Sequence, residues 1–195
     1  MENNIENKEM TAQQSLGIIS EMMNNSRRAI LQNSGKHFIL WGILLTVMSL
    51  VIYELIHVTR TPIWNLLWFA MPLIGFPMAH FTIGKSKVEV PQNIISKQLH
   101  GIWLAYCAFA VVISAVFMFI APQNLTLIII MAFGFAECVS GIALKNWAII
   151  VGGFIIGVGG AIAAIILRSE AQLLLFTLCG VILTVSGLIV KSQNK

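Results

Sequence analysis

The hydropathy pattern of this chain consists of long apolar runs joined by short polar links. Six runs cover most of the sequence, at residues 38–56, 63–83, 101–121, 125–144, 147–167 and 171–190. Each run has about 20 residues, and a helix of that length, rising 1.5 Å per residue, crosses a hydrocarbon core of about 30 Å. The pattern therefore predicts an all-α polytopic membrane protein, built as a bundle of six transmembrane helices.

The segment before the first run has a different pattern. Residues 1–10 are rich in Asn and Glu and are predicted to be disordered. Residues 11–33 are predicted to form an amphipathic helix, with Gly35 where a C-terminal cap would fall. Its apolar residues recur at helical spacing on one face: Leu16, Ile19, Met23 and Ile30. We expect this helix to lie on the membrane surface or under the bundle, with pairing to another protein as the alternative.

Composition leaves room for only one large domain. The chain is 57% hydrophobic and 10% charged, against about 25% charged residues in a soluble domain. The links between runs are too short to bury a core of their own. We therefore divide the chain into a cytoplasmic extension at 1–36, a transmembrane domain at 37–191 and a cytoplasmic tail at 192–195.

The cationic residues predict an orientation. With a cytoplasmic N-terminus, nine residues near span ends face the cytoplasm, namely Arg27, Arg28, Lys36, Lys85, Lys87, Lys97, Lys145, Lys191 and Lys195, and two lie outside, Arg60 and Arg168. Lys and Arg near span ends favour the cytoplasmic side, so both termini are expected there. Such a rim also attracts anionic lipid head groups. The net charge of +4 is explained by topology and calls for no nucleic-acid partner.

One acidic residue, Glu137, lies deep within a run, about two turns from Lys145. A carboxylate at that depth costs several kcal/mol unless it is protonated, paired or hydrated. His80, at a similar predicted depth in the second run, is its expected partner. Two interpretations follow: a proton- or cation-coupled site, or a neutral Glu137 hydrogen-bonded to Ser140 or to a backbone carbonyl.

Two further patterns concern the shape of the helices. Pro72 and Pro77 each remove a helical hydrogen bond, which predicts a kink in the second span. In the fifth span Gly153, Gly157 and Ala161 are spaced by four, and such a stripe of small residues lets a neighbouring helix approach closely. We expect that neighbour to belong to the same chain rather than to a second copy.

No catalytic or cofactor signature is present. The chain has no Asp and no HExxH, GxSxG or Walker A motif, and its three cysteines all fall within predicted spans. We predict no enzyme activity, no cofactor and no metal site.

The stretch from residue 134 to 145, GFAECVSGIALK, together with Trp41-Gly42 and the segment from Ser15 to Arg27, resembles a group of small six-span membrane proteins common in Bacteroidota. Members of that group have an amphipathic N-terminal helix before the first span. The resemblance implies a bacterial inner (cytoplasmic) membrane and brings no catalytic residues.

The sequence favours a non-enzymatic membrane protein that is structural or regulatory, acting through helix packing and the helix at 11–33. Its partners are the lipid bilayer and either another protein or a second copy of the chain. The alternative is a small proton- or cation-coupled transporter or channel that uses Glu137, His80 and the kinked second span. Transport predicts a hydrated pocket at Glu137, whereas a structural role predicts that Glu137 is packed and hydrogen-bonded.

Overall fold

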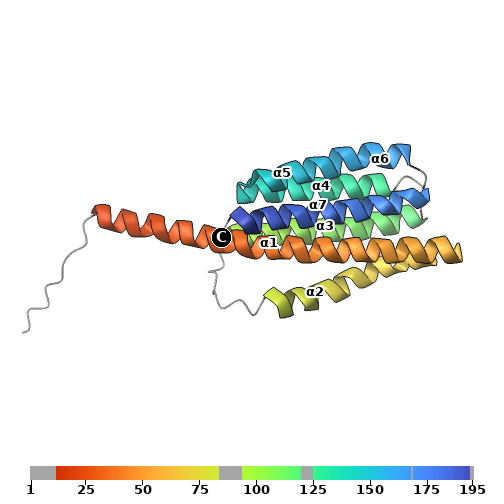
Figure 1. Ribbon diagram of the computed structural model, residues 1–195, viewed down its shortest axis with the longest axis horizontal. Helices are drawn as coiled ribbons and strands as arrows, with labels where there is room; N and C mark the ends of the chain where they lie inside the picture. The colour runs from red at the N-terminus through yellow and green to blue at the C-terminus, as the bar shows by residue number, and fades with distance from the viewer. Residues whose placement is uncertain (1–11, 84–93, 120–124, 168, 194–195) are drawn as a thin grey trace, which may run out of the picture.

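The computed structural model describes residues 12–83, 94–119, 125–167 and 169–193, and Figure 1 shows them as a bundle of helices with one helix projecting from it. Six helical stretches are long and apolar enough to cross a membrane: Ile30–Thr59, Pro62–Thr82, Lys97–Val116, Leu125–Leu144, Trp147–Ile166 and Ala171–Gln193. The predicted six-helix, all-α membrane architecture is confirmed. The expectation of disorder at 1–10 lies outside the described residues.

The first span and the helix predicted before it form a single helix, α1 (Ala12–Thr59). The predicted helix end near Asn33 was therefore wrong, because the helix continues past residue 36. Gly35 does not adopt the left-handed conformation of a helix cap. A Cβ at Gly35 would lie 3.1 Å from the carbonyl oxygen of Gly187 in the last helix, so this glycine serves helix packing instead.

Because α1 is continuous, its first part cannot lie flat along the leaflet while its second part crosses the membrane. Figure 1 shows the N-terminal part running outward along the axis of the same helix, away from the bundle rather than beneath it. Residues 12–29 therefore project from the bundle instead of packing under it, whereas Ile30 and Leu31 belong to its core.

The second span has two parts, a 3₁₀ helix η1 (Pro62–Phe69) and the α-helix α2 (Ala70–Ile83). Pro72 lies in the first turn of α2, where its missing N–H costs nothing. The change of helix type thus comes just before Pro72, while Pro77 lies inside α2 without ending it. In Figure 1 α2 leans away from α1 toward its Ile83 end.

The remaining spans are α3 (Ile94–Phe119), α4 (Leu125–Leu144), a fifth span in three segments, and α7 (Ser169–Gln193). The fifth span consists of α5 (Trp147–Phe154), a π-helical turn η2 (Ile155–Gly159) and α6 (Gly160–Ile166). Single π-helical turns are rare and local, and here one begins two residues after Gly153 of α5.

A two-residue turn holds α4 and α5 together. Lys145 adopts a left-handed conformation with φ 51°, and the backbone N–H of Asn146 donates to the carbonyl oxygen of Gly141 at 2.9 Å. The Asn146 side chain then caps α5 by accepting a 3.0 Å hydrogen bond from the N–H of Ala148. This geometry turns the chain back on itself and sets α4 and α5 antiparallel and in contact.

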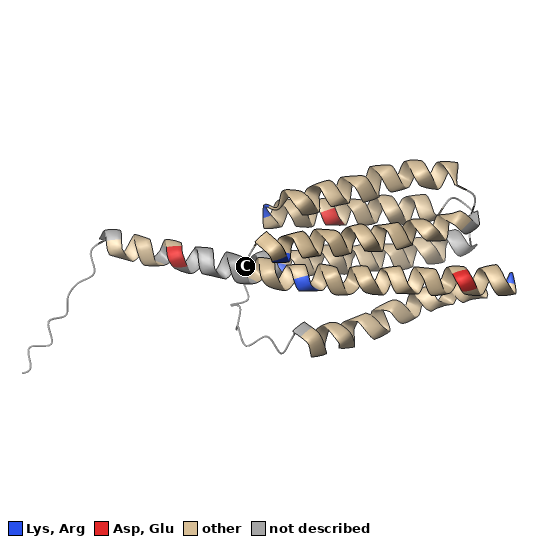
Figure 2. Ribbon diagram, in the orientation of Figure 1, with Lys and Arg blue, Asp and Glu red and all other residues tan. Residues whose placement is uncertain are grey.

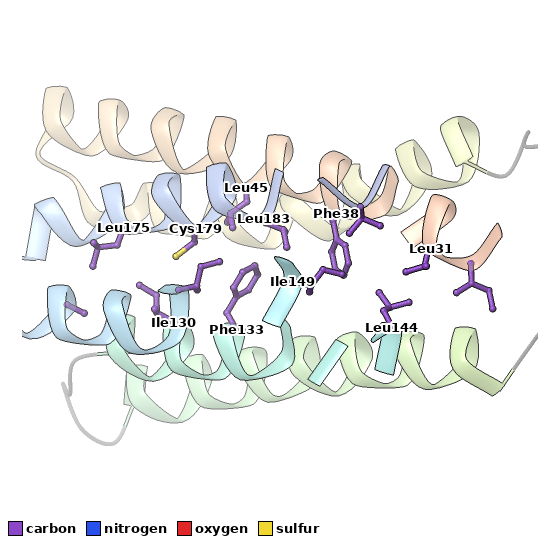
Figure 3. Close-up of a cluster of buried hydrophobic side chains, with 14 residues drawn as sticks. Leu31, Phe38, Leu45, Ile130, Phe133, Leu144, Ile149, Leu175, Cys179 and Leu183 are labelled. Atoms are coloured by element: carbon purple, nitrogen blue, oxygen red, sulfur yellow. The ribbon is translucent and has the colours of Figure 1, made fainter. Parts of the chain in front are cut away.

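The central pair of the bundle is α1 and α7, which have the most extensive contact of any two elements. α4 packs on the fifth span, α3 packs on α4, and α2 packs on α1. Buried apolar side chains fill the space between the α1–α7 pair and α4 with α5, as Figure 3 shows for Leu45, Leu183, Phe133 and Ile149. Trp103 and Tyr106 of α3 close the cluster through edge contacts with Phe133.

Small residues line the contact between α1 and α7. A Cβ at Gly42 would lie 2.7 Å from the carbonyl oxygen of Gly180, and a Cβ at Gly180 would lie 2.7 Å from that of Gly42. The hydroxyl groups of Ser49 and Thr177 share a hydrogen bond of 2.8 Å across the same contact. This seam was not predicted. Its signal is present, because Gly35, Gly42 and Ser49 are spaced by seven residues, the repeat that keeps one face of a helix toward a partner.

Candidate functional site

The site with the most unusual chemistry is the carboxyl group of Glu137 in α4. Its side chain is completely buried, with 0% of its surface exposed. Glu137 shares the inward face of α4 with buried residues at helical spacing, namely Ile130, Phe133, Ser140 and Leu144. The face that carries this acid is therefore the same face that forms the apolar core.

Glu137 faces α5 and α7 rather than α2. A Cβ at Gly152 of α5 would lie 2.8 Å from Glu137 Oε1 and 2.5 Å from the Oγ of Ser186 in α7. Both oxygens therefore border the small space that the missing side chain of Gly152 leaves. The side chain of Ser186 is also buried, and its hydroxyl is the polar group that lies beside the carboxyl of Glu137.

Neither carboxyl oxygen of Glu137 accepts a hydrogen bond from the residues that the structure describes. Ser140, the partner considered in the sequence, donates its hydroxyl to the carbonyl oxygen of Ala136 at 2.7 Å. The thiol of Cys138 contacts the carbonyl oxygen of Ile150 at 3.4 Å. A buried polar group without a partner costs about 1–3 kcal/mol, and more if it is charged. The packing expected of a structural role is therefore present at Glu137, whereas the expected hydrogen bond to Ser140 or to a backbone carbonyl is not.

No cationic side chain compensates the carboxyl within the described residues. The titratable groups close enough to interact with Glu137 are the thiols of Cys138 in α4 and Cys179 in α7. Cys179 also interacts with Tyr106 of α3. The surroundings of Glu137 thus contain hydroxyl and thiol groups but no positive charge.

A second polar contact lies nearer the end of the bundle. The side-chain amide of Asn146, at the turn between α4 and α5, donates to Gln193 Oε1 of α7 at 2.9 Å. Between this level and that of Glu137 the helices place three buried apolar residues: Leu144, Ile149 and Val190. From Gly152 to Asn146 is six residues along α5, or about 9 Å. One apolar layer therefore separates the carboxyl from the polar end of the bundle.

The structure does not bring His80 to Glu137. His80 is exposed on α2, where its ring contacts Phe81 at 5.8 Å between centroids. Among the described residues, the main contacts of α2 are with α1 and η1, so Pro72 and Pro77 also belong to that side of the bundle. The equal depth of two residues in their own helices does not tell which helices are neighbours.

The structure places Gly153 and Gly157 of the fifth span against α4. A Cβ at Gly153 would lie 2.6 Å from the backbone nitrogen of Cys138, and a Cβ at Gly157 would lie 3.4 Å from Gly134 Cα. Ala161, the third residue of the stripe, is buried as well. These contacts set the position of α5 and thus of Gly152 beside the carboxyl.

Within the described part of the chain, no group of three or more His, Cys, Asp or Glu side chains could hold a metal ion. Comparisons of the chain with protein-family models, with curated proteins and with solved structures find no match.

Proposed function

We propose that this chain is a non-enzymatic, multi-pass protein of the bacterial inner membrane that displays the projecting end of α1 to a protein partner in the cytoplasm. The observation that carries this proposal is the continuity of α1. Residues 12–29 precede Ile30, the first residue of α1 that is described as buried, and extend over about 27 Å. Leu16 and Ile18 on this segment are 66% and 45% exposed. Apolar side chains on a helix held rigidly by its own span are suited to docking on a groove of another protein.

The projecting end is proposed to be cytoplasmic because cations gather at the same end of the bundle. Lys97, Lys145 and Lys191 lie at or beside the ends of their spans, and Lys36 lies six residues into the first span. Figure 2 shows blue segments gathered at the end of the bundle from which α1 projects. Arg60 lies at the opposite end, after α1. Lys85, Lys87, Arg168 and Lys195 lie outside the described residues. The cluster supports a cytoplasmic placement of both termini, together with contact to anionic lipid head groups.

A reporter fused after Lys195 tests this orientation. We expect a fluorescent protein that matures only in the cytoplasm to be bright there, and alkaline phosphatase, which needs the periplasm, to be inactive. A fusion after Arg60 should give the reverse pattern. An active phosphatase at the C-terminus would contradict the orientation. The projecting end of α1 would then lie outside the cytoplasm, where it could not bind a cytoplasmic partner.

Deletion of residues 1–29 tests the partner role. The deletion stops before Ile30 and Leu31 because both belong to the buried core. We expect the truncated chain to insert and to keep its melting temperature, but to lose the protein that co-purifies with the full chain. Substitution of Leu16 and Ile18 by Asp should have the same effect without shortening α1. Recovery of the same partner with the truncated chain would contradict the proposal.

Proton or cation transport is the second candidate, favoured by the unpartnered carboxyl of Glu137. It cannot use the arrangement expected from the sequence, since His80 and the prolines lie on α2, which packs on α1. An ion passing Glu137 would instead have to cross the layer formed by Leu144, Ile149 and Val190.

A further inference from the structure

We propose that Glu137 and Ser186 form a binding site for a single proton, which exchanges with water at the end of the bundle where Asn146 meets Gln193. The site differs from the one expected in the sequence, where His80 was the partner of Glu137. It is independent of any partner that binds the projecting end of α1.

The ligand is a proton because the site offers too few groups for another cation. One carboxyl oxygen, Glu137 Oε1, and one hydroxyl, that of Ser186, border the space at Gly152, and the carboxyl group adds only one further oxygen. Ca²⁺ takes six to eight oxygen ligands, and Mg²⁺ requires an octahedral set. No described Lys, Arg or His balances the charge of an ionised carboxylate here. One bound proton removes that charge, and the resulting O–H can donate to the Oγ of Ser186.

The polar groups around Glu137, on α4 itself and on the neighbouring helices, support the same ligand. They are Cys138 of α4, Cys179 and Ser186 of α7, and, one step further, Tyr106 of α3. α5 contributes only glycine at this level, Gly152 and Gly153. None of these groups carries a positive charge, so none of them can neutralise an ionised Glu137. A bound proton is the group that does so.

The route to water follows from where polar groups lie. Toward the Asn146 end the carboxyl is separated from a polar contact by one apolar layer. Toward the opposite end the core continues through Phe133, Ile130 and Ile156, all buried and apolar. A fluctuation that parts Val190 from Leu144 and Ile149 would admit water to Glu137, whereas the other direction requires opening several layers. The proton therefore exchanges at the end that carries Lys145.

Infrared spectroscopy of the full chain in lipid bilayers tests the site, because the carbonyl stretch of a protonated carboxyl is separate from the bands of a carboxylate. At pH 7 we expect this band in the wild type, its loss in Glu137→Gln, and its retention in Glu54→Gln, which alters an exposed residue. Ser186→Ala should shift the band to higher frequency because the carboxyl loses its hydrogen-bond acceptor. If the wild type lacks the band, the carboxyl is ionised and the proposal is wrong.

Transfer into D₂O tests the route with the wild-type chain, whatever the stability of the Glu137 variants. Deuteration of the acid shifts the band, and we expect this shift to be several-fold faster in Val190→Ala, which thins the layer near Asn146. Ile156→Ala is the matched control on the other side of Glu137 and should leave the rate unchanged. A band that never shifts would show that the proton of Glu137 does not exchange with water, and the proposal would be wrong. Faster exchange in Ile156→Ala than in Val190→Ala would overturn the proposed route.

Discussion

Replacing Gly134 by alanine is expected to force α4 away from the fifth span and to lower the free energy of unfolding by about 3 kcal/mol. The added Cβ would collide with backbone atoms of Gly157 and lie 2.6 Å from the carbonyl oxygen of Gly153. Backbone atoms cannot give way by a change of rotamer, so one helix must shift. The melting temperature of the detergent-solubilised chain measures the loss.

Gly101→Ala is the matched control for this substitution. Gly101 also lies within a span helix, but no atom lies within 4 Å of a Cβ built there. Alanine has the higher helix propensity, so this variant should melt at the same temperature as the wild type or slightly above it. Equal melting temperatures for Gly134→Ala and Gly101→Ala would show that α4 and the fifth span are not in close contact.

The second large effect is expected at the seam between α1 and α7. In Gly42→Ala the new Cβ would lie 2.7 Å from both the carbonyl oxygen of Gly180 and the backbone nitrogen of Thr184. We expect a loss of about 2–3 kcal/mol, since the two helices must separate along a contact that also holds the Ser49–Thr177 hydrogen bond.

Gly17→Ala provides the comparison on the same helix, because Gly17 lies on the projecting part of α1 with no atom within 4 Å of the added Cβ. That variant should melt like the wild type. Proteolysis offers a second measurement, since a loosened seam should make the span of α1 more readily cleaved in Gly42→Ala than in Gly17→Ala. The same cleavage rate in both variants would show that the contact between α1 and α7 does not stabilise the span of α1.

The glycines show what a sequence pattern can predict about helix contacts and what it cannot. The spacing of Gly153, Gly157 and Ala161 indicated a close helix contact, but not that α4 would supply the opposite surface. Gly35 had a local signal for a helix end, in the polar sequence around it, and a longer-range role against Gly187. The local signal was overridden because the helix gains packing on α7 by continuing.

Glu137 is a second example, because its depth could be predicted from the sequence but its neighbours could not. Its depth in the fourth run indicated a buried acid facing the bundle, and the structure places it there. Its neighbour could not be inferred, because Ser186 is far away in the sequence and is brought close only by the packing of α7 beside α4 and α5. The sequence suggested His80 as the partner because its side chain can carry a charge. His80 lies on α2, however, and α2 packs on α1 rather than on α4.

The six spans could be determined from the sequence alone because the transfer of a helix into lipid depends on the hydropathy of about 20 consecutive residues, which is a local quantity. Which helices are neighbours depends instead on how closely their backbones approach, and this is a property of pairs of surfaces. Only the tertiary structure therefore decided that α1 runs unbroken out of the bundle, that α1 and α7 share a seam of small residues, and that Glu137 faces Ser186 across Gly152.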